Sequence, residues 1–266
     1  MKIVVLVKQV PATDKVKIDE EKGTMIREGV EAELNPLDLY AVEEAVRIKQ
    51  NLGDDVEISV ISMGPRMAVE AVKNAIAIGC DKGYLLSDRK FAGADTLSTA
   101  YSLSMGIKKI VDEFDLILCG ERATDGETGQ VGPGIGAHLG LPVLTYVSKI
   151  EEVGVGKIIA HRAIEGGYEV VEAPTPVLVS VLKEINEPSI PTLRGKIKAK
   201  NTEIPILTAE DIGADEDRLG LKGSPTRVVK TFHPKVTRKG EILSASKDLD
   251  EAVDGLVDFL GKIEII

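Results

Sequence analysis

The chain has 266 residues, of which 43% are hydrophobic and 29% are charged, and its formal net charge is −10. This length and composition predict an ordinary soluble protein with a sizeable core, and the negative charge argues against non-specific binding to nucleic acid. No apolar run reaches the roughly 18 residues that span a bilayer, and Met1-Lys2 leads directly into a predicted strand without a signal-peptide pattern. We therefore expect a cytoplasmic location.

Cysteine and histidine usage gives no sign of redox or metal chemistry. Cys80 and Cys119 lack a CxxC spacing and fall in predicted buried positions, so we expect inert thiols. His138, His161 and His233 have no partners at metal-ligand spacing. The absence of tryptophan and the few aromatic residues also argue against a base-stacking surface.

Strands and helices alternate along the first half of the chain. Short apolar runs predict buried strands at residues 1–7, 56–61, 83–86 and 114–119. Apolar residues at helical spacing predict helices over residues 35–48, 67–78 and 95–112, and another after Pro133. This alternation predicts an α/β fold with a doubly wound, mostly parallel sheet, whose ligands lie beyond the carboxyl ends of the strands.

Residues 120–136 are the most informative stretch of the sequence. They follow a buried strand, space glycines among hydroxyl and carboxylate side chains, and enter a helix near Pro133. A glycine-rich turn before a helix presents backbone N–H groups and a positive dipole end to an anion, so we interpret it as a phosphate-holding turn. Neither a Walker loop nor a GxGxxG fingerprint is present. An ordinary surface turn remains the alternative.

Three other strand ends carry similar signals. The turns at residues 7–9, 63–65 and 93–96 each follow a predicted strand, and Asp95 or Thr96 is a plausible N-cap of the next helix. Together with residues 124–132, these turns are expected to face one crevice.

The pattern changes near residue 150. Alternating runs at 143–150, 156–163 and 168–172 predict an added hairpin with its corner at residues 164–167, and residues 176–182 read as a strand that returns to the central sheet. A proline-bounded basic segment follows at 186–205. We therefore divide the chain into a nucleotide-binding domain (1–190) and a recognition loop with a C-terminal arm (191–266).

A final helix is predicted over residues 246–261. Its apolar stripe comprises Leu249, Val253, Leu256, Val257 and Leu260. Such a stripe must be buried, so we expect the arm to dock on another subunit, with folding back onto its own sheet as the alternative.

In order and spacing, these motifs resemble the beta subunit of electron transfer flavoprotein nearly from end to end. The motifs that carry the resemblance are Lys8-Gln9-Val10, Asn35-Pro36, residues 41–47, Gly64-Pro65, residues 93–96, residues 124–133, Arg162 with Glu165-Gly166-Gly167, and Asn186-Glu187-Pro188. The resemblance implies a Rossmann-like, adenine nucleotide alpha-hydrolase-like domain. It also implies an alpha subunit that holds the electron-transferring FAD and is embraced by the C-terminal arm.

Two branches of the family differ in what fills the beta-subunit crevice. One branch binds structural AMP and carries electrons from acyl-CoA dehydrogenases. The other binds a second FAD and bifurcates the electrons of NADH between an acceptor dehydrogenase or quinone oxidoreductase and a low-potential ferredoxin or flavodoxin. Gly126 and Gly129 stand where the AMP branch tends to carry bulkier polar groups, which leaves room and N–H donors for a diphosphate. We therefore favour FAD and bifurcation, with AMP as the alternative.

The resemblance also implies the residues that contact the nucleotide. Adenine and ribose would lie near Leu6, Val7, Lys8, Asn35, Met63 and Gly64. The phosphates would lie near Asp95, Thr96, Thr99, Thr124, Asp125, Gly126, Glu127, Thr128, Gly129, Gln130, Val131 and Gly132. Asp125 and Glu127 are expected to cap the turn or bind ribose hydroxyls. No catalytic side chain is expected, because the flavin carries the chemistry.

Leu193 matches the family's recognition loop, in which a leucine inserts into a partner dehydrogenase. Nearby charges, including Arg194, would orient it. A leucine packed on its own domain is the alternative.

Two other classes share parts of this pattern. A stress-protein-like nucleotide-binding module would have the sheet and the crevice but no reason for the long arm. An adenylating enzyme would need an SGGxD-type loop after the first strand, where this chain has Lys8-Gln9-Val10-Pro11.

Overall fold

A computed structural model describes residues 1–12, 32–53, 55–229 and 248–262, the backbone at 18–19 and 24–25, and the single residues 244, 246 and 264. It divides into two compact units, Met1–Lys230 and Thr231–Ile266.

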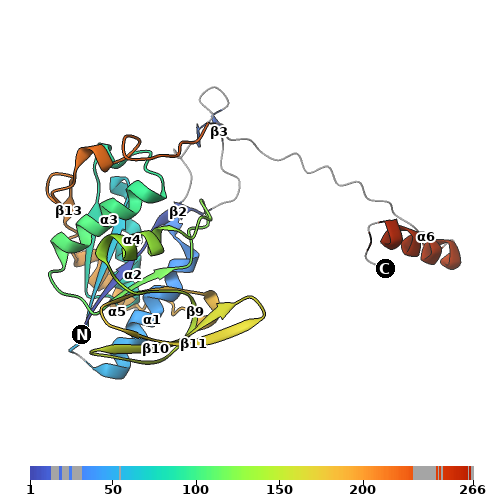
Figure 1. The fold of residues 1–266 in the computed structure, drawn as a ribbon, viewed down its shortest axis with the longest axis horizontal. Coiled ribbons are helices and arrows are strands. Elements are labelled where there is room, and N and C mark those ends of the chain that lie inside the picture. Colours follow the sequence, from blue (N-terminus) through green and yellow to red (C-terminus); the bar gives the residue numbers. More distant parts are fainter. Residues whose placement is uncertain are drawn as a thin grey trace. The chain divides into compact units, whose positions relative to one another are not determined.

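The first unit is built on a nine-stranded sheet with the order β11-β10-β9-β12-β8-β1-β6-β7-β13 (Figure 1). Its strands are β1 (Lys2–Leu6), β6 (Glu57–Met63), β7 (Lys82–Leu86), β8 (Leu116–Gly120), β9 (Val143–Gly154), β10 (Lys157–Ile164), β11 (Gly167–Pro174), β12 (Val177–Val181) and β13 (Ile206–Leu207). The pairs from β9 through β12, β8, β1, β6 and β7 to β13 are parallel, whereas β9, β10 and β11 form an antiparallel meander. The predicted sheet and its added hairpin are therefore confirmed.

Two short antiparallel pairs stand apart from this sheet. They are β2 (Gln9–Pro11) with β5 (Ala32–Leu34), and β3 (Ile18–Asp19) with β4 (Thr24–Met25).

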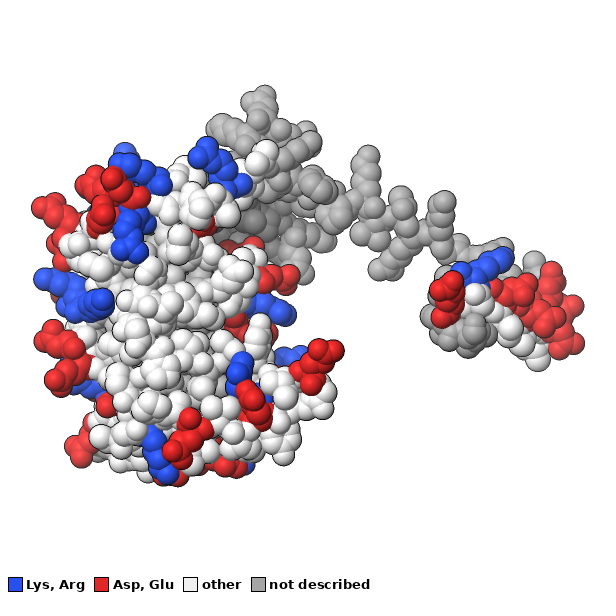
Figure 2. Space-filling view, viewed as in Figure 1, with Lys and Arg blue, Asp and Glu red and all other residues white. Residues whose placement is uncertain are grey.

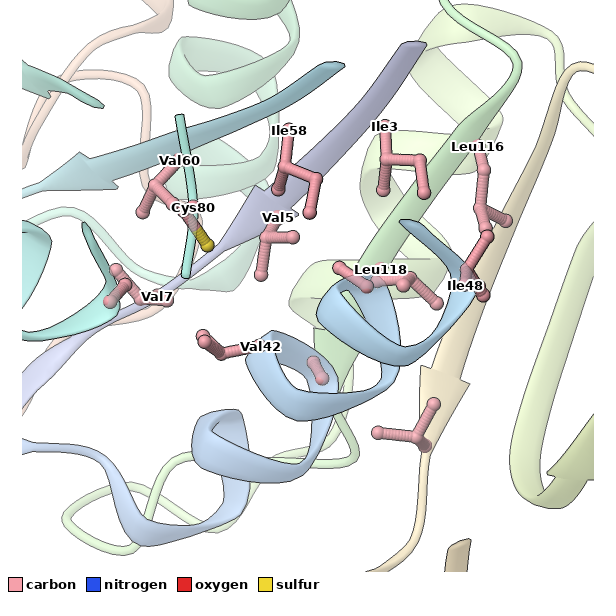
Figure 3. Close-up of a cluster of buried hydrophobic side chains, with 14 of the residues drawn as sticks. Ile3, Val5, Val7, Val42, Ile48, Ile58, Val60, Cys80, Leu116 and Leu118 are labelled. Carbon is pink, nitrogen blue, oxygen red and sulfur yellow. The ribbon is translucent and has the colours of Figure 1, made fainter. Parts of the chain in front are cut away.

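Helices cover both faces of the sheet. The helices of the first unit are α1 (Pro36–Leu52), α2 (Val69–Ile78), α3 (Thr96–Ile110), α4 (Val131–Leu139) and α5 (Leu193–Asn201). One buried cluster joins the inner faces of α1, α2 and α5 to the strand residues Ile3 and Val5, and a second joins α3 and α4 to Val4 and Leu6. Figure 3 shows part of the first cluster, where Val42 and Ile48 of α1 face the sheet. Alternate residues of β1 belong to different clusters, so both faces of the strand are buried. This explains why its sequence is a continuous apolar run.

The strand order reverses at β1. The chain passes from β1 through α1 to β6 on one side, and later returns through α3 to β8 on the other side. Because α1 and α4, the helices that follow β1 and β8, pack on opposite faces of the sheet, the chain diverges at the carboxyl ends of these two strands. This divergence is the topological switch point where open α/β sheets bind ligands.

The segment expected to be a proline-bounded loop contains a helix. Thr192 caps α5 by accepting a hydrogen bond from the Gly195 N–H at 3.0 Å, and Lys198 donates to the Cys80 carbonyl at 2.9 Å. A Cβ at Gly195 would lie 2.0 Å from the Ala77 carbonyl oxygen, so glycine allows α5 to approach α2 closely. With β13 paired to β7, the chain beyond residue 190 continues within the first unit.

The second unit contains α6 (Leu249–Lys262), which confirms the final helix. No residue of α6 is buried. Among the helices of the described ranges, none has the length and apolar character that crossing a membrane requires. The docking of this helix as an arm stays a prediction.

Candidate functional site

The carboxyl ends of β6, β1 and β8 lie side by side at one edge of the sheet. Leu6 is in register with Ile61 of β6, and Val5 is in register with Leu118 of β8. The segments that follow these strands therefore emerge from one edge of the sheet, whereas residues 93–96 follow β7; that the four turns face one ligand stays a prediction.

A buried carboxylate joins two of these strand ends. Asp38, in the first turn of α1, accepts a hydrogen bond from the Lys8 N–H at 2.8 Å and another from the Gly120 N–H at 3.3 Å. Burial raises the pKa of the Asp38 carboxyl from 3.8 to about 7, although the N–H groups of Lys8 and Gly120, the Asn35 side chain and the Lys8 ammonium all oppose the rise. Asp38 was not among the predicted site residues, although it lies on the buried stripe of α1 with Ala41, Val42 and Ala45, where an acid is unexpected.

Asn35 holds the loop after β8 rather than opening toward solvent. Its side chain is fully buried, donates to the Arg122 carbonyl at 2.9 Å and accepts from the Thr124 N–H at 3.2 Å. Its own N–H donates to the Lys8 carbonyl at 2.8 Å. Asn35 therefore fixes the position of the loop relative to β1.

The loop from Glu121 to Gln130 presents a row of free backbone donors. The N–H groups of Gly126 and Glu127 both turn back to the Ala123 carbonyl, and Glu127 and Gly129 adopt φ of 54° and 63°. The next donors, the N–H groups of residues 128–132, bond to no acceptor within the part of the chain that the structure describes. α4 begins at Val131 without a side-chain cap, so this row ends at the positive end of a helix.

The Lys8 side chain, just beyond the end of β1, contacts this loop. Its Nζ lies 2.5 Å from Oδ1 of Asp125, which is largely shielded from solvent, whereas the lysine side chain is about half exposed. This ion pair places a cation beside the free N–H groups. An anion bound here would have to share the Lys8 ammonium with the Asp125 carboxylate.

The start of α3 is already capped by its own carboxylate. Asp95 accepts hydrogen bonds from the N–H groups of Leu97 and Ser98 at 3.0 and 3.1 Å, and also holds the N–H and hydroxyl of Thr226. Partial burial opposes ionisation, but these hydrogen bonds lower the pKa of Asp95 below its ordinary value. The contact between α3 and the loop is instead the Thr96 hydroxyl, 3.3 Å from Oε1 of Gln130. Thr99 is half-buried on the next turn.

The residues expected near adenine present main chain rather than side chains. Leu6 and Val7 are buried in the core, and the Val7 N–H donates to the Ile61 carbonyl at 3.1 Å. Met63 and Gly64 are half-buried, and the Gly64 N–H donates to the Leu86 carbonyl at 3.0 Å. The N–H groups of Val7 and Gly64 are therefore already used between neighbouring strands, and of these four residues only Met63 and Gly64 are partly exposed.

Glycines at two points let the backbone approach closely. A Cβ on Gly120 would meet Oδ1 of Asp38 at 2.6 Å and the Leu37 backbone at 2.8 Å, and a Cβ on Gly132 would meet Sγ of Cys119 at 3.0 Å.

Cys80 and Cys119 are both buried and unpaired, and burial raises the pKa of each thiol. Both thiols are therefore held as protonated, unreactive groups, as expected.

Comparison with known proteins agrees with this geometry. The model of the electron transfer flavoprotein domain family matches residues 22–212. Over the whole of both chains, the protein is 48% identical to the electron transfer flavoprotein subunit beta of Thermoanaerobacterium thermosaccharolyticum. The chain belongs to the electron transfer flavoprotein beta-subunit family.

Two further relatives have other names. The caffeyl-CoA reductase-Etf complex subunit CarD of Acetobacterium woodii is 44% identical over the whole of both chains. Protein FixA of Azotobacter vinelandii is 41% identical over 94% of this chain and 90% of its own. These matches confirm the family and the fold expected from the sequence. Members of this family pair with an alpha subunit and bind flavin or AMP.

The raised pKa of Asp38 gives a prediction about stability and pH. Because the folded protein holds this proton more tightly than the unfolded chain, the stability contributed by Asp38 is complete below pH 3.8 and is lost as the pH rises through about 7. Asparagine does not titrate. The free energy of unfolding of the wild type, relative to Asp38→Asn, should therefore fall by about 3 kcal/mol between roughly pH 5 and 8 in urea titrations.

Asp115→Asn is the matched control for this experiment. Oδ2 of Asp115 accepts a hydrogen bond from the Lys2 N–H at 2.7 Å, and so joins β8 to β1 at the opposite end of the same strands. This variant keeps Asp38 and should keep the wild-type dependence on pH. If the free energies of unfolding of the wild type and Asp38→Asn differ by the same amount at every pH, the assignment is contradicted.

Proposed function

We propose that this chain is the beta subunit of a bifurcating electron transfer flavoprotein and binds FAD in the crevice at the ends of β1, β6 and β8. The observation that carries the proposal is the row of free N–H groups at residues 128–132, at the start of α4. A row of this length suits a diphosphate, because successive N–H groups can each donate to a different phosphate oxygen.

Individual residues divide the work of holding such a nucleotide. The N–H groups of residues 128–132 would hold the diphosphate, the Lys8 ammonium would add charge, and the Thr96 hydroxyl would close the far side. Asp125 and Glu127, which are anionic, would bind ribose hydroxyls or keep the turn in shape. When bound, FAD would supply hydride acceptance from NADH and one-electron transfer to the acceptors. The contribution of this chain is to place and orient it.

The proposed partners follow from the family and from one exposed feature, the helix α6. The alpha subunit would complete a heterodimer, and α6 with its apolar side chains would form part of the arm that binds it. The acceptors would be a dehydrogenase or quinone oxidoreductase and a ferredoxin or flavodoxin. Similarity to a subunit of a caffeyl-CoA reductase-Etf complex supports a partner that acts on a CoA thioester.

One observation favours the alternative, a non-bifurcating subunit with structural AMP. The Lys8 ammonium is already paired with Asp125, so less positive charge remains for a second phosphate. We weigh the free N–H groups more heavily than this single pair, because five successive donors at residues 128–132 are more than one phosphate group needs.

Nucleotide analysis of the heterodimer tests the proposal. The chain is co-expressed with its alpha subunit, and flavin and AMP are extracted and counted by chromatography. We expect two FAD per heterodimer. One FAD with one AMP would exclude bifurcation and leave a simple electron carrier.

Gly129→Val should abolish FAD binding in the crevice of this chain while the alpha subunit keeps its FAD. Gly129 has a φ of 63°, which a β-branched residue adopts only with strain, and a Cβ there would already be in van der Waals contact with the Glu121 carbonyl oxygen at 3.4 Å, so we expect valine to shift the loop. We expect one FAD per heterodimer. Gly140→Val is the matched control, because Gly140 has a φ of 67° and open space around it at the other end of α4. Both variants should lose roughly 1–2 kcal/mol of stability, but Gly140→Val should keep both flavins.

Leu193→Ala should weaken transfer to the partner dehydrogenase. Leu193 starts α5 and is 77% exposed, and its neighbour Ile190 is 86% exposed, so both are available to a partner. Loss of one apolar anchor costs about 2 kcal/mol, or roughly thirtyfold in the second-order rate of electron transfer. Leu221→Ala, which removes another exposed leucine of the same unit, should leave that rate unchanged. An unchanged rate in Leu193→Ala would make Leu193 an ordinary surface residue.

A further inference from the structure

Tyr146 has a backbone conformation that is unusual for a bulky residue. It lies inside β9 with a φ of 57°, in the left-handed region that favours glycine. Conformations of this kind persist where the surrounding structure enforces them, and they are concentrated at binding sites.

A β-bulge enforces the conformation. Leu144 is in register with Val179 and Val147 with Val181, so the single residue Ser180 of β12 faces two residues of β9. The Tyr146 N–H donates to the buried Ser180 hydroxyl at 3.3 Å. Bulges of this kind redirect side chains, particularly next to active sites.

The redirected side chain reaches the loop that we assign to the diphosphate. The Tyr146 hydroxyl oxygen would lie 3.8 Å from a Cβ placed on Gly129, and the tyrosine is 45% exposed. The loop is therefore flanked by an aromatic ring that is accessible to a ligand.

The strand order sets the direction of a bound dinucleotide. From β6 and β1, where adenine is expected, the edge of the sheet runs through β8, whose loop would hold the phosphates, to β12 and β9. Two strand spacings, about 10 Å in total, separate β8 from β9. A mononucleotide that ends at the β8 loop stops short of β9, whereas a dinucleotide continues toward it.

We propose that Tyr146 contacts the half of the dinucleotide beyond the diphosphate, and so favours FAD over AMP in this crevice. The inference rests on the proposed function and deepens it, because it assigns a residue that distinguishes the two nucleotides. The bulge at Ser180 and the positive φ of Tyr146 are then the device that turns the ring toward the ligand.

Affinity for the two nucleotides tests the assignment. The full-length heterodimer, freed of crevice nucleotide but retaining the alpha-subunit flavin, is titrated with FAD and separately with AMP. Tyr146→Ala should raise the dissociation constant for FAD by about tenfold and change that for AMP by less than about twofold. Tyr146→Phe keeps the ring and should bind FAD like the wild type.

Tyr168→Ala is the matched control. Tyr168 is a still more exposed tyrosine, on β11, where its ring stacks on His161. This variant should bind both nucleotides normally. A Tyr146→Ala variant that loses FAD and AMP equally would show that the ring only supports the phosphate loop, and unchanged FAD affinity would show that it makes no contact.

A glycine variant separates backbone strain from ligand contact. Since glycine adopts a φ of 57° without strain, Tyr146→Gly should unfold at a higher urea concentration than Tyr146→Ala, while both bind FAD equally weakly. A wild-type crevice that binds AMP but no FAD would overturn the proposed function and this inference together. A wild type that binds FAD no better than Tyr146→Ala would overturn the inference alone.

Discussion

The bridge from the Asp38 carboxylate to the N–H groups of Lys8 and Gly120 is the interaction on which the crevice depends. It joins β1 to β8 at the point where the strand order reverses, and the Asp38 side chain is buried. Any side chain at Gly120 would collide with this carboxylate, so the sequence at the end of β8 is restricted to glycine by the bridge. Once the two strand ends are held, Asn35 can fix the following loop from one side and Lys8 can reach it from the other.

The site is made mainly of backbone. Its donors are N–H groups of the β8 loop, and its side chains mostly hold that loop or balance its charge. This arrangement suits a protein whose chemistry belongs to a bound flavin, because the chain has to place the cofactor and leave its reactive atoms accessible. On the face seen in Figure 2, acidic and basic side chains are interspersed around a broad area without charged side chains. Recognition of protein partners would rest on exposed apolar anchors such as Leu193, beside the basic side chains of α5.

Periodicity and turn chemistry predicted most of the fold, and the particular misses have physical reasons. The strand at 114–119, its glycine turn and the helix after it follow from local sequence alone, as β8 and α4 show. α5 was missed because it is polar and lies between Pro191 and Pro205, although Thr192 is a recognisable N-cap. The role of Asp38 was open to inference from an acid on an apolar helix face. The conformation of Tyr146 could not be inferred from the sequence, because it depends on how β9 pairs with β12, a strand that is not its neighbour in the sequence.

An experimental structure of the heterodimer with its natural nucleotide tests the central claim most directly, since that claim places a diphosphate on the backbone after β8. The account predicts phosphate oxygens within hydrogen-bond distance of N–H groups of residues 128–132, with adenine beside Val7 and Met63. A nucleotide whose phosphates lie away from this loop, or a crevice filled by side chains of the alpha subunit, would contradict it.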